Sequence, residues 1–233
     1  MNKGFIYENK ILGLMKEHNL VSEDFINQET AGCDNTKPDM VISIRGKDIN
    51  IEVKKDIRSQ AGGTSIRYNN GEFEFVKPIE GISEDHVFEK LKEKEIFIKE
   101  FLDFHNAKQI PFTTTKKMWK ESVDLGLLKK TNISLNCDMS FIENHYTNKN
   151  TFYIQIGKKG FYFMKEDIVN LGLPKLKGEM SLELRLTRGG SKLNKHGVRV
   201  CSASLRAQAR ISKLDQSQFN LEDIDLLRSL AQM

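Results

Sequence analysis

The chain contains few of the patterns that mark disulfide-rich, zinc-binding or membrane proteins. Its 233 residues include only three cysteines, Cys33, Cys137 and Cys201, which lie far apart and form no Cys-x-x-Cys pair. This argues against both a disulfide framework and a structural zinc site. No apolar run approaches the ~18 residues needed to cross a bilayer, and no hydrophobic signal region adjoins Met1–Gly4. We therefore expect a cytoplasmic protein without a membrane partner.

The rest of the composition is typical of a globular protein. Hydrophobic residues make up 39% of the chain, and no internal repeat, low-complexity tract or heptad series is evident. A chain of this length can bury one substantial core, with room for a small appended lobe. We expect an α/β (α+β) fold.

A predicted hairpin within Pro38–Lys55 is the most informative segment. Apolar and polar residues alternate on both sides of a turn near Gly46, which predicts two antiparallel strands. Asp39 precedes the first strand, and twelve residues separate it from Glu52 on the second.

The alternation also predicts which side chains share a face. If Arg45 pairs with Asp48, Asp39 lies opposite Lys54, and Asp39, Glu52 and Lys54 project from the same face. Carboxylate oxygens suit Mg²⁺, and a lysine can position water or stabilise a transition state. The face therefore has the chemistry for phosphodiester hydrolysis.

The pattern formed by Pro38, Asp39 and Glu52-Val53-Lys54 resembles that of the PD-(D/E)XK nuclease superfamily. The resemblance implies a restriction-endonuclease-like core, with a central mixed sheet flanked by helices. It also implies that Asp39, Glu52 and the backbone carbonyl of Val53 bind one or two Mg²⁺ ions, for which Mn²⁺ can substitute. Lys54 would orient or deprotonate the attacking water, leaving a 5′ phosphate. The alternative is a surface hairpin with a Glu–Lys pair.

Glu8 is a candidate for the same site. A helix is predicted from Phe5 to about His18, and Glu8 falls on its apolar side, three residues after Phe5 and four before Leu12. A charge there is avoided unless it is paired or binds a metal. Because many members of the superfamily carry an acid on the helix before the catalytic sheet, the resemblance makes Glu8 a further metal ligand. The alternative is a rim carboxylate whose head reaches water.

Basic residues concentrate towards the end of the chain. Eight Lys and Arg residues, and no Asp or Glu, occur between Arg185 and Lys213. Such a window attracts phosphate backbones, so we expect DNA as the partner rather than a solvated surface. The candidate contacts are Arg185, Arg188, Lys192, Lys195, Arg199, Arg206 and Arg210. In a loop after the hairpin, Gly62 and Gly63 permit close approach of the backbone to a ligand, and Arg58, Gln60 and Arg67 are further candidates.

The order of expected helices and strands along the sequence predicts a catalytic core over residues 1–130 and a β-rich DNA-binding part with a closing helix over residues 150–233. The polar, irregular segment 131–150 separates them. Expected helices cover residues 83–107, 115–128 and 220–230. Expected strands cover residues 72–77, which would extend the central sheet, and residues 151–156, 161–164, 181–188 and 198–211, with a basic loop at 189–197.

These features together predict a Mg²⁺-dependent endodeoxyribonuclease, with a sequence-specific, restriction-type enzyme among the options. A structure-selective nuclease such as a junction resolvase is the first alternative, and an exonuclease is the next. One exonuclease branch carries Gln-x-x-x-Tyr after the lysine, whereas Gln60 and Tyr68 are eight residues apart. The non-enzyme alternative is a catalytically silent DNA-binding module. A homodimer would cut both strands of a palindrome, and the oligomeric state stays open.

Overall fold

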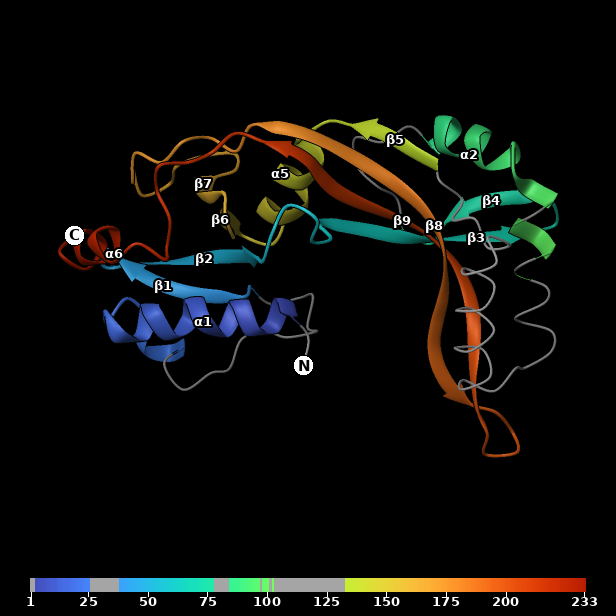
Figure 1. Cartoon of the computed structure of the whole chain (residues 1–233), viewed down its shortest axis with the longest axis horizontal. Helices are drawn as coiled ribbons and strands as arrows, with labels where there is room; N and C mark the ends of the chain where they lie inside the picture. Colours follow the sequence, from blue (N-terminus) through green and yellow to red (C-terminus); the bar gives the residue numbers. More distant parts are fainter. Residues whose placement is uncertain (1–2, 26–37, 78–83, 97, 101, 103–132) are drawn as a thin grey trace. The chain divides into compact units, whose positions relative to one another are not determined.

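The computed structural model describes residues 3–25, 38–77, 84–96, 98–100, 102 and 133–233 (Figure 1). They form two sheets with helices, which confirms the mixed α/β class. The chain divides into two compact units. Unit 1 comprises Met1–Ala61, Asp138–Met180 and Arg210–Met233, and unit 2 comprises Gly62–Cys137 and Ser181–Ala209. No helix among the described residues has the length and apolar character required to span a membrane.

The two units do not coincide with the expected division into residues 1–130 and 150–233. The reason is that the sheet of unit 1 combines strands from both sides of the expected boundary. The boundary segment is itself structured, because it contains strand β5 (Ile133–Cys137) and helix α5 (Ser140–Thr147).

A mixed four-stranded sheet forms the centre of unit 1. Its order is β1-β2-β6-β7, with β1 at Met40–Ile44, β2 at Lys47–Lys54, β6 at Thr151–Ile156 and β7 at Gly160–Phe163. The pair β1–β2 is antiparallel, β2–β6 is parallel, and β6–β7 is the expected antiparallel hairpin. Helix α5 directly precedes β6 in the chain. The insertion of unit 2 therefore separates β2 from the helix and strand that complete its sheet.

The β1–β2 hairpin has a register two residues away from the expected one. Ile44 pairs with Lys47, so the loop contains only Arg45 and Gly46. Both have positive φ angles, 53° and 69°, as in the tight turns that match the twist of a hairpin. The expected pairing of Arg45 with Asp48 is therefore wrong. Because side chains alternate with a period of two, a shift of two residues leaves every side chain on its expected face.

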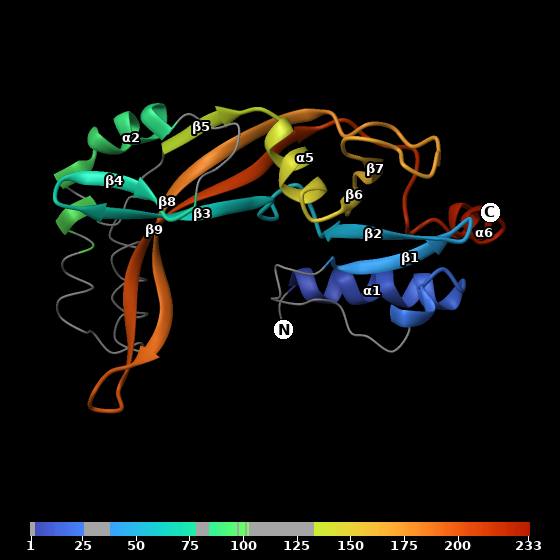
Figure 2. The ribbon, with the colours of Figure 1, turned by 180° about the vertical axis from the view of Figure 1, so that it is seen from behind.

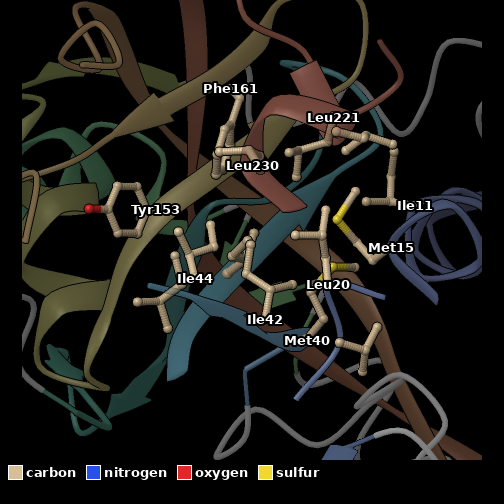
Figure 3. Close-up of a cluster of buried hydrophobic side chains, with 14 of the residues drawn as sticks. Ile11, Met15, Leu20, Met40, Ile42, Ile44, Tyr153, Phe161, Leu221 and Leu230 are labelled. Carbon is tan, nitrogen blue, oxygen red and sulfur yellow. The ribbon is translucent and has the colours of Figure 1, made fainter. Parts of the chain in front are cut away.

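One face of this sheet carries the hydrophobic core. Alternate residues of β1 and β2 are buried, including Met40, Ile42 and Ile51, and they pack with Ile11 and Met15 of α1 (Lys3–Glu17) (Figure 3). The core also contains residues of α6 (Ile224–Ala231), the closing helix. Figures 1 and 2 show α1 on one side of β1 and β2 and α5 on the other. Helices α1 and α6 match the expected segments closely.

Unit 2 contains most of a five-stranded sheet of order β4-β3-β9-β8-β5. Strand β3 spans Gly62–Asn69, β4 spans Glu72–Phe75, β8 spans Gly178–Leu193 and β9 spans Arg199–Leu214. Helix α2 (Glu84–Lys92) packs Phe88 against Phe73 and Phe75 of β4. A short 3-10 helix, η1 (Glu23–Phe25), belongs to unit 1.

Several expectations for unit 2 need correction. Strand β4 pairs with β3 and does not extend the sheet of β1 and β2. The single helix expected at 83–107 is interrupted: α2 ends at Lys92, and after a turn at residues 93–94 the described residues 95, 96, 98–100 and 102 are again helical. Residues 103–107 lie outside the described part, as does the segment 115–128. Residues up to Leu193 belong to β8 rather than to a loop. The strand expected at 198–211 is confirmed as β9.

The pair Gly62 and Gly63 begins a strand rather than a ligand loop. A Cβ atom on Gly63 would lie 2.2 Å from the backbone oxygen of Ala207, and the φ of Gly63 is +152°. Glycine is therefore required here because β3 approaches β9 closely. The structure gives this pair a role in strand packing.

Candidate functional site

The side chains of Asp39 and Glu52 are both buried in unit 1. Asp39 directly precedes β1, and Glu52 and Lys54 lie two residues apart near the end of β2. The ammonium of Lys54 forms an ion pair with Oε1 of Glu52. Val53 donates its backbone N–H to Oδ2 of Asp39 over 2.8 Å. The structure thus brings the predicted catalytic residues together at the carboxyl end of β2.

The environment of Asp39 opposes its negative charge. Burial, followed by the charge of Glu52, raises the pKa of Asp39 to about 7, although Lys54 and the Val53 N–H favour the ionised form. A carboxyl with this pKa titrates near neutrality. This property is common at functional sites, although structural ion-pair networks also produce it.

Lys54 stays a cation in this environment. Burial disfavours its ammonium form, but Tyr146, Glu52 and Asp39 outweigh burial and hold the pKa of Lys54 above its usual range. The Nζ atom also lies 5.7 Å from the ring centroid of Tyr146, within the range of a cation–π contact. As placed here, Lys54 can donate hydrogen bonds and stabilise negative charge, but it is not poised to accept a proton.

Glu8 joins this cluster from α1. Burial is the main cause that raises the pKa of Glu8, Glu52 adds to it, and Lys54 opposes it. The Oε2 atom of Glu8 is buried and has no hydrogen-bond partner among the described residues. A buried carboxylate oxygen without a partner is costly, so a ligand that binds it would stabilise the site. Glu8 as a whole is partly exposed, so the alternative of a rim carboxylate stays open beside that of a metal ligand.

A buried polar network holds the N-terminal part of α1, which carries Glu8. Gln155 of β6 is fully buried and donates to the hydroxyl of Tyr7 over 3.1 Å. Its Oε1 accepts the backbone N–H of Leu221 over 3.1 Å, and Tyr7 donates to Glu222 over 3.0 Å. Because Val53 pairs with Gln155, the network links α1 to the strand pair that carries the site. This arrangement fixes the position of Glu8 relative to Glu52.

The donor set fits a divalent cation in charge and chemistry. Three carboxylates and one ammonium leave two negative charges when all are ionised, and oxygen ligands suit Mg²⁺. No group of three or more His, Cys, Asp or Glu among the described residues already has the spacing of a metal site. Two of the candidate ligands already have other partners, because Lys54 pairs with Glu52 and the Val53 N–H donates to Asp39. Metal binding would therefore require local rearrangement of these side chains.

Helix α5 supplies site residues that the sequence analysis missed. Tyr146 is buried beside Lys54, and burial raises the pKa of Tyr146 well above its usual range. His145 and Lys149 flank it, with His145 packed on Phe141 at 5.9 Å between ring centroids. A local signal was Asp138, just before the helix, whose carboxylate accepts the backbone N–H of Ser140 over 2.7 Å.

The residues predicted to bind DNA are divided between the two units. Arg58 and Gln60 are exposed in unit 1, while Arg67 is exposed on β3 in unit 2. The carbonyl oxygen of Arg58 accepts a hydrogen bond from Arg210 of β9. This contact gives Arg210 a structural role within unit 1.

The basic window lies mainly on the β8–β9 hairpin. Lys195 and Arg199 are exposed near its turn, and Arg206 is half-buried with an Nε atom that has no partner among the described residues. Arg185 approaches Gln208 at 3.5 Å and Glu183 at 3.6 Å, so an acid just outside the window pairs with it. Arg188 and Lys192 belong to β8, but their side chains lie outside the described part of the chain.

Comparisons with known proteins provide no relative from which a function for the site could be inferred. No family model matches the chain, and no curated protein or solved structure was found to match it.

Proposed function

We propose that the protein is a Mg²⁺-dependent nuclease that hydrolyses phosphodiester bonds of DNA at the cluster of Glu8, Asp39, Glu52 and Lys54. The observation that carries the proposal is the buried excess of negative charge, in which the pKa of Asp39 is raised to about 7 and Oε2 of Glu8 has no partner among the described residues. A divalent cation would neutralise this excess and satisfy the buried oxygen.

The arrangement of unit 1 supports the superfamily resemblance. Its mixed sheet has α1 and α5 on opposite sides, and the motif residues occupy one hairpin at the end of the parallel pair β2–β6. Functional sites in open sheets with parallel strands tend to lie at the carboxyl ends of those strands. We propose that unit 1 has the restriction-endonuclease-like topology.

The chain's own residues have distinct roles in this proposal. Asp39 and Glu52 would hold the ion, with Glu8 and the carbonyl of Val53 completing the oxygen ligands. The bound ion would acidify a water molecule and neutralise charge on the phosphate. Lys54, kept as an ammonium by its neighbours, would orient the water and stabilise charge developing on the phosphate oxygens. This favours orientation over deprotonation as the role of Lys54.

Incubation with a panel of DNA substrates in Mg²⁺ tests the proposal. Supercoiled plasmid, linear duplex, single strands and four-way junctions distinguish an endonuclease from a junction resolvase or an exonuclease, and mapping of the ends tests the expected 5′ phosphate. We expect cleavage in Mg²⁺ or Mn²⁺ and none in chelator. Absence of cleavage on every substrate, combined with tight DNA binding, would support the catalytically silent alternative instead.

A further inference from the structure

A second group of charged residues lies beside the candidate metal site. His145, Tyr146 and Lys149, which we call the α5 corner, lie at the end of α5 and in the turn that follows it. The Nζ atom of Lys149 is 5.6 Å from the ring centroid of Tyr146, and that of Lys54 is 5.7 Å from the same centroid. Two ammonium groups therefore gather around one buried ring.

The ammonium of Lys149 has no carboxylate partner in the described part of the chain. Its Nζ lies 3.3 Å from Nε2 of His145, and burial, together with Lys149 and Lys54, lowers the pKa of His145 to about 4. The imidazole is therefore neutral at physiological pH and can accept a hydrogen bond from Lys149 through Nε2. A neutral partner orients the ammonium without cancelling its charge, so an anion can still bind it.

The packing of the α5 corner limits how far Lys149 can move. The side chain is half-buried, Tyr146 is buried, and the ring of His145 lies edge-on to that of Tyr146 at 4.9 Å between centroids. A lysine held in this way loses less side-chain entropy on binding an anion than a lysine on the open surface. The corner is thus organised for anion binding before any ligand arrives.

We propose that Lys149, held by His145 and Tyr146, binds a phosphate of the nucleic-acid backbone next to the bond that is cut. The inference rests on the proposed nuclease function and adds a phosphate-binding position to its site. Carboxylates would hold the metal on one side, and the ammonium groups of Lys54 and Lys149 would hold substrate phosphates around Tyr146. His145 and Tyr146 act here as positioning residues.

Substitution of Lys149 tests the proposal through DNA binding as well as activity. Lys149→Met removes the charge and keeps an unbranched side chain against Tyr146, whereas Lys149→Arg keeps the charge. Lys165→Met, at an exposed lysine of the same unit, is the matched control. Binding to a short duplex is measured in Ca²⁺ across a salt series. Lys149→Met should weaken binding roughly tenfold and reduce the log–log salt slope by about one, with Lys149→Arg close to wild type.

Cleavage kinetics provide the second readout. A residue that holds a neighbouring phosphate should raise KM more than it lowers kcat, so Lys149→Met should be rescued largely by saturating DNA. If Lys149→Met lowers the melting temperature, Lys149→Gln is used instead, because it also removes the charge.

The outcomes separate this inference from the proposed function. If Asp39→Asn abolishes cleavage while Lys149→Met and Lys149→Gln bind DNA with wild-type affinity and salt slope, the Lys149 inference alone is wrong. If the protein cuts no DNA but the Lys149 variants still lose affinity and salt slope, the nuclease proposal fails and the phosphate site stands. If the wild-type protein binds no DNA, the phosphate site is wrong as well.

Discussion

Asp39 is a buried carboxyl of the candidate site whose pKa lies near neutrality. Its pKa of about 7 reflects burial first and the charge of Glu52 second. A carboxyl whose pKa is higher in the folded protein than in the unfolded chain holds its proton more firmly when folded. Its favourable contribution to stability is therefore complete below about pH 4 and is lost as the pH rises through about 7.

Asp39→Asn should consequently change the pH dependence of stability. The neutral amide needs no proton, and its oxygen can still accept the Val53 N–H. Relative to wild type, we expect the variant to gain on the order of 2 kcal/mol between pH 5 and pH 9 in metal-free buffer. Urea denaturation at a series of pH values measures this. A difference between variant and wild type that does not vary with pH would mean that Asp39 ionises at its ordinary pKa.

Glu8 offers a second test at the scale of one residue. Oε2 of Glu8 is buried without a partner among the described residues. A bound metal ion would explain why a carboxylate oxygen is buried there. Glu8→Gln should preserve the melting temperature and reduce the stabilisation that Mg²⁺ provides at pH 8, whereas Glu17→Gln on the exposed side of α1 should alter neither. Thermal denaturation with and without Mg²⁺ distinguishes them. A lowered melting temperature with unchanged Mg²⁺ stabilisation would indicate a purely structural carboxylate.

The β1–β2 hairpin shows which structural features the alternation of residues can predict. Alternation predicted both strands and the common face of Asp39, Glu52 and Lys54, because a two-residue period defines which face each side chain occupies. The register was two residues wrong, since the pattern is equally satisfied by any even shift. Only the positive φ angles of Arg45 and Gly46 identify the loop.

Long-range pairing explains what the sequence could not predict. The parallel pairing of β2 with β6 joins residues about a hundred positions apart, across an inserted unit, and no local pattern encodes such a contact. The place of Tyr146 beside Lys54 could not be predicted for the same reason. Its segment was polar enough to resemble a linker, and its place beside Lys54 exists only once β6 has joined the sheet.

Gly157 links α1 to the end of β2 and provides a test at this scale. A Cβ atom there would lie 2.1 Å from the backbone oxygen of Lys55 and 3.0 Å from Cζ of Tyr7. Gly157→Ala should therefore cost roughly 1–3 kcal/mol and reduce cleavage, because it displaces the strand end that carries Lys54. Stability by urea denaturation and cleavage rate per folded molecule are measured together.

Gly46→Ala is the matched control for Gly157→Ala. A Cβ on Gly46 meets no atom within 4 Å, but its φ of +69° disfavours alanine. We expect a loss of about 1 kcal/mol with an unchanged cleavage rate. Equal effects of the two substitutions on cleavage would show that the β2 end tolerates displacement and that the site does not depend on its position.

At the scale of the whole molecule, the residues of the candidate metal site all belong to unit 1, whereas most of the basic window belongs to unit 2. Arg206 should contribute to DNA affinity, because it is a partly exposed cation on β9, a strand whose sequence lacks acids. Arg206→Ala should weaken binding to all sequences alike and flatten the salt slope by about one if the contact is to phosphate. A base contact would instead cost roughly 1–3 kcal/mol at one preferred base.

The control for Arg206 is Lys90→Ala on α2, where the lysine pairs with Glu93 within the same unit. Anisotropy titrations in Ca²⁺ across a salt series compare the two variants. If Arg206→Ala, and likewise Arg185→Ala, leaves both affinity and salt slope at the level of Lys90→Ala, the DNA-binding assignment of this strand pair is wrong.

Cleavage in Mg²⁺ by wild type, Asp39→Asn and Asp48→Asn tests the central claim most directly. Asp48 lies on the same hairpin and accepts a hydrogen bond from Ser22, so its substitution controls for the loss of a hairpin carboxylate. Single-turnover rates on plasmid at pH 8, measured over a Mg²⁺ titration, should fall at least about a hundredfold for Asp39→Asn and stay near wild type for Asp48→Asn. A rate for folded Asp39→Asn equal to that of wild type, or no Mg²⁺-dependent cleavage by the wild-type protein, would contradict a metal-dependent nuclease site at this cluster.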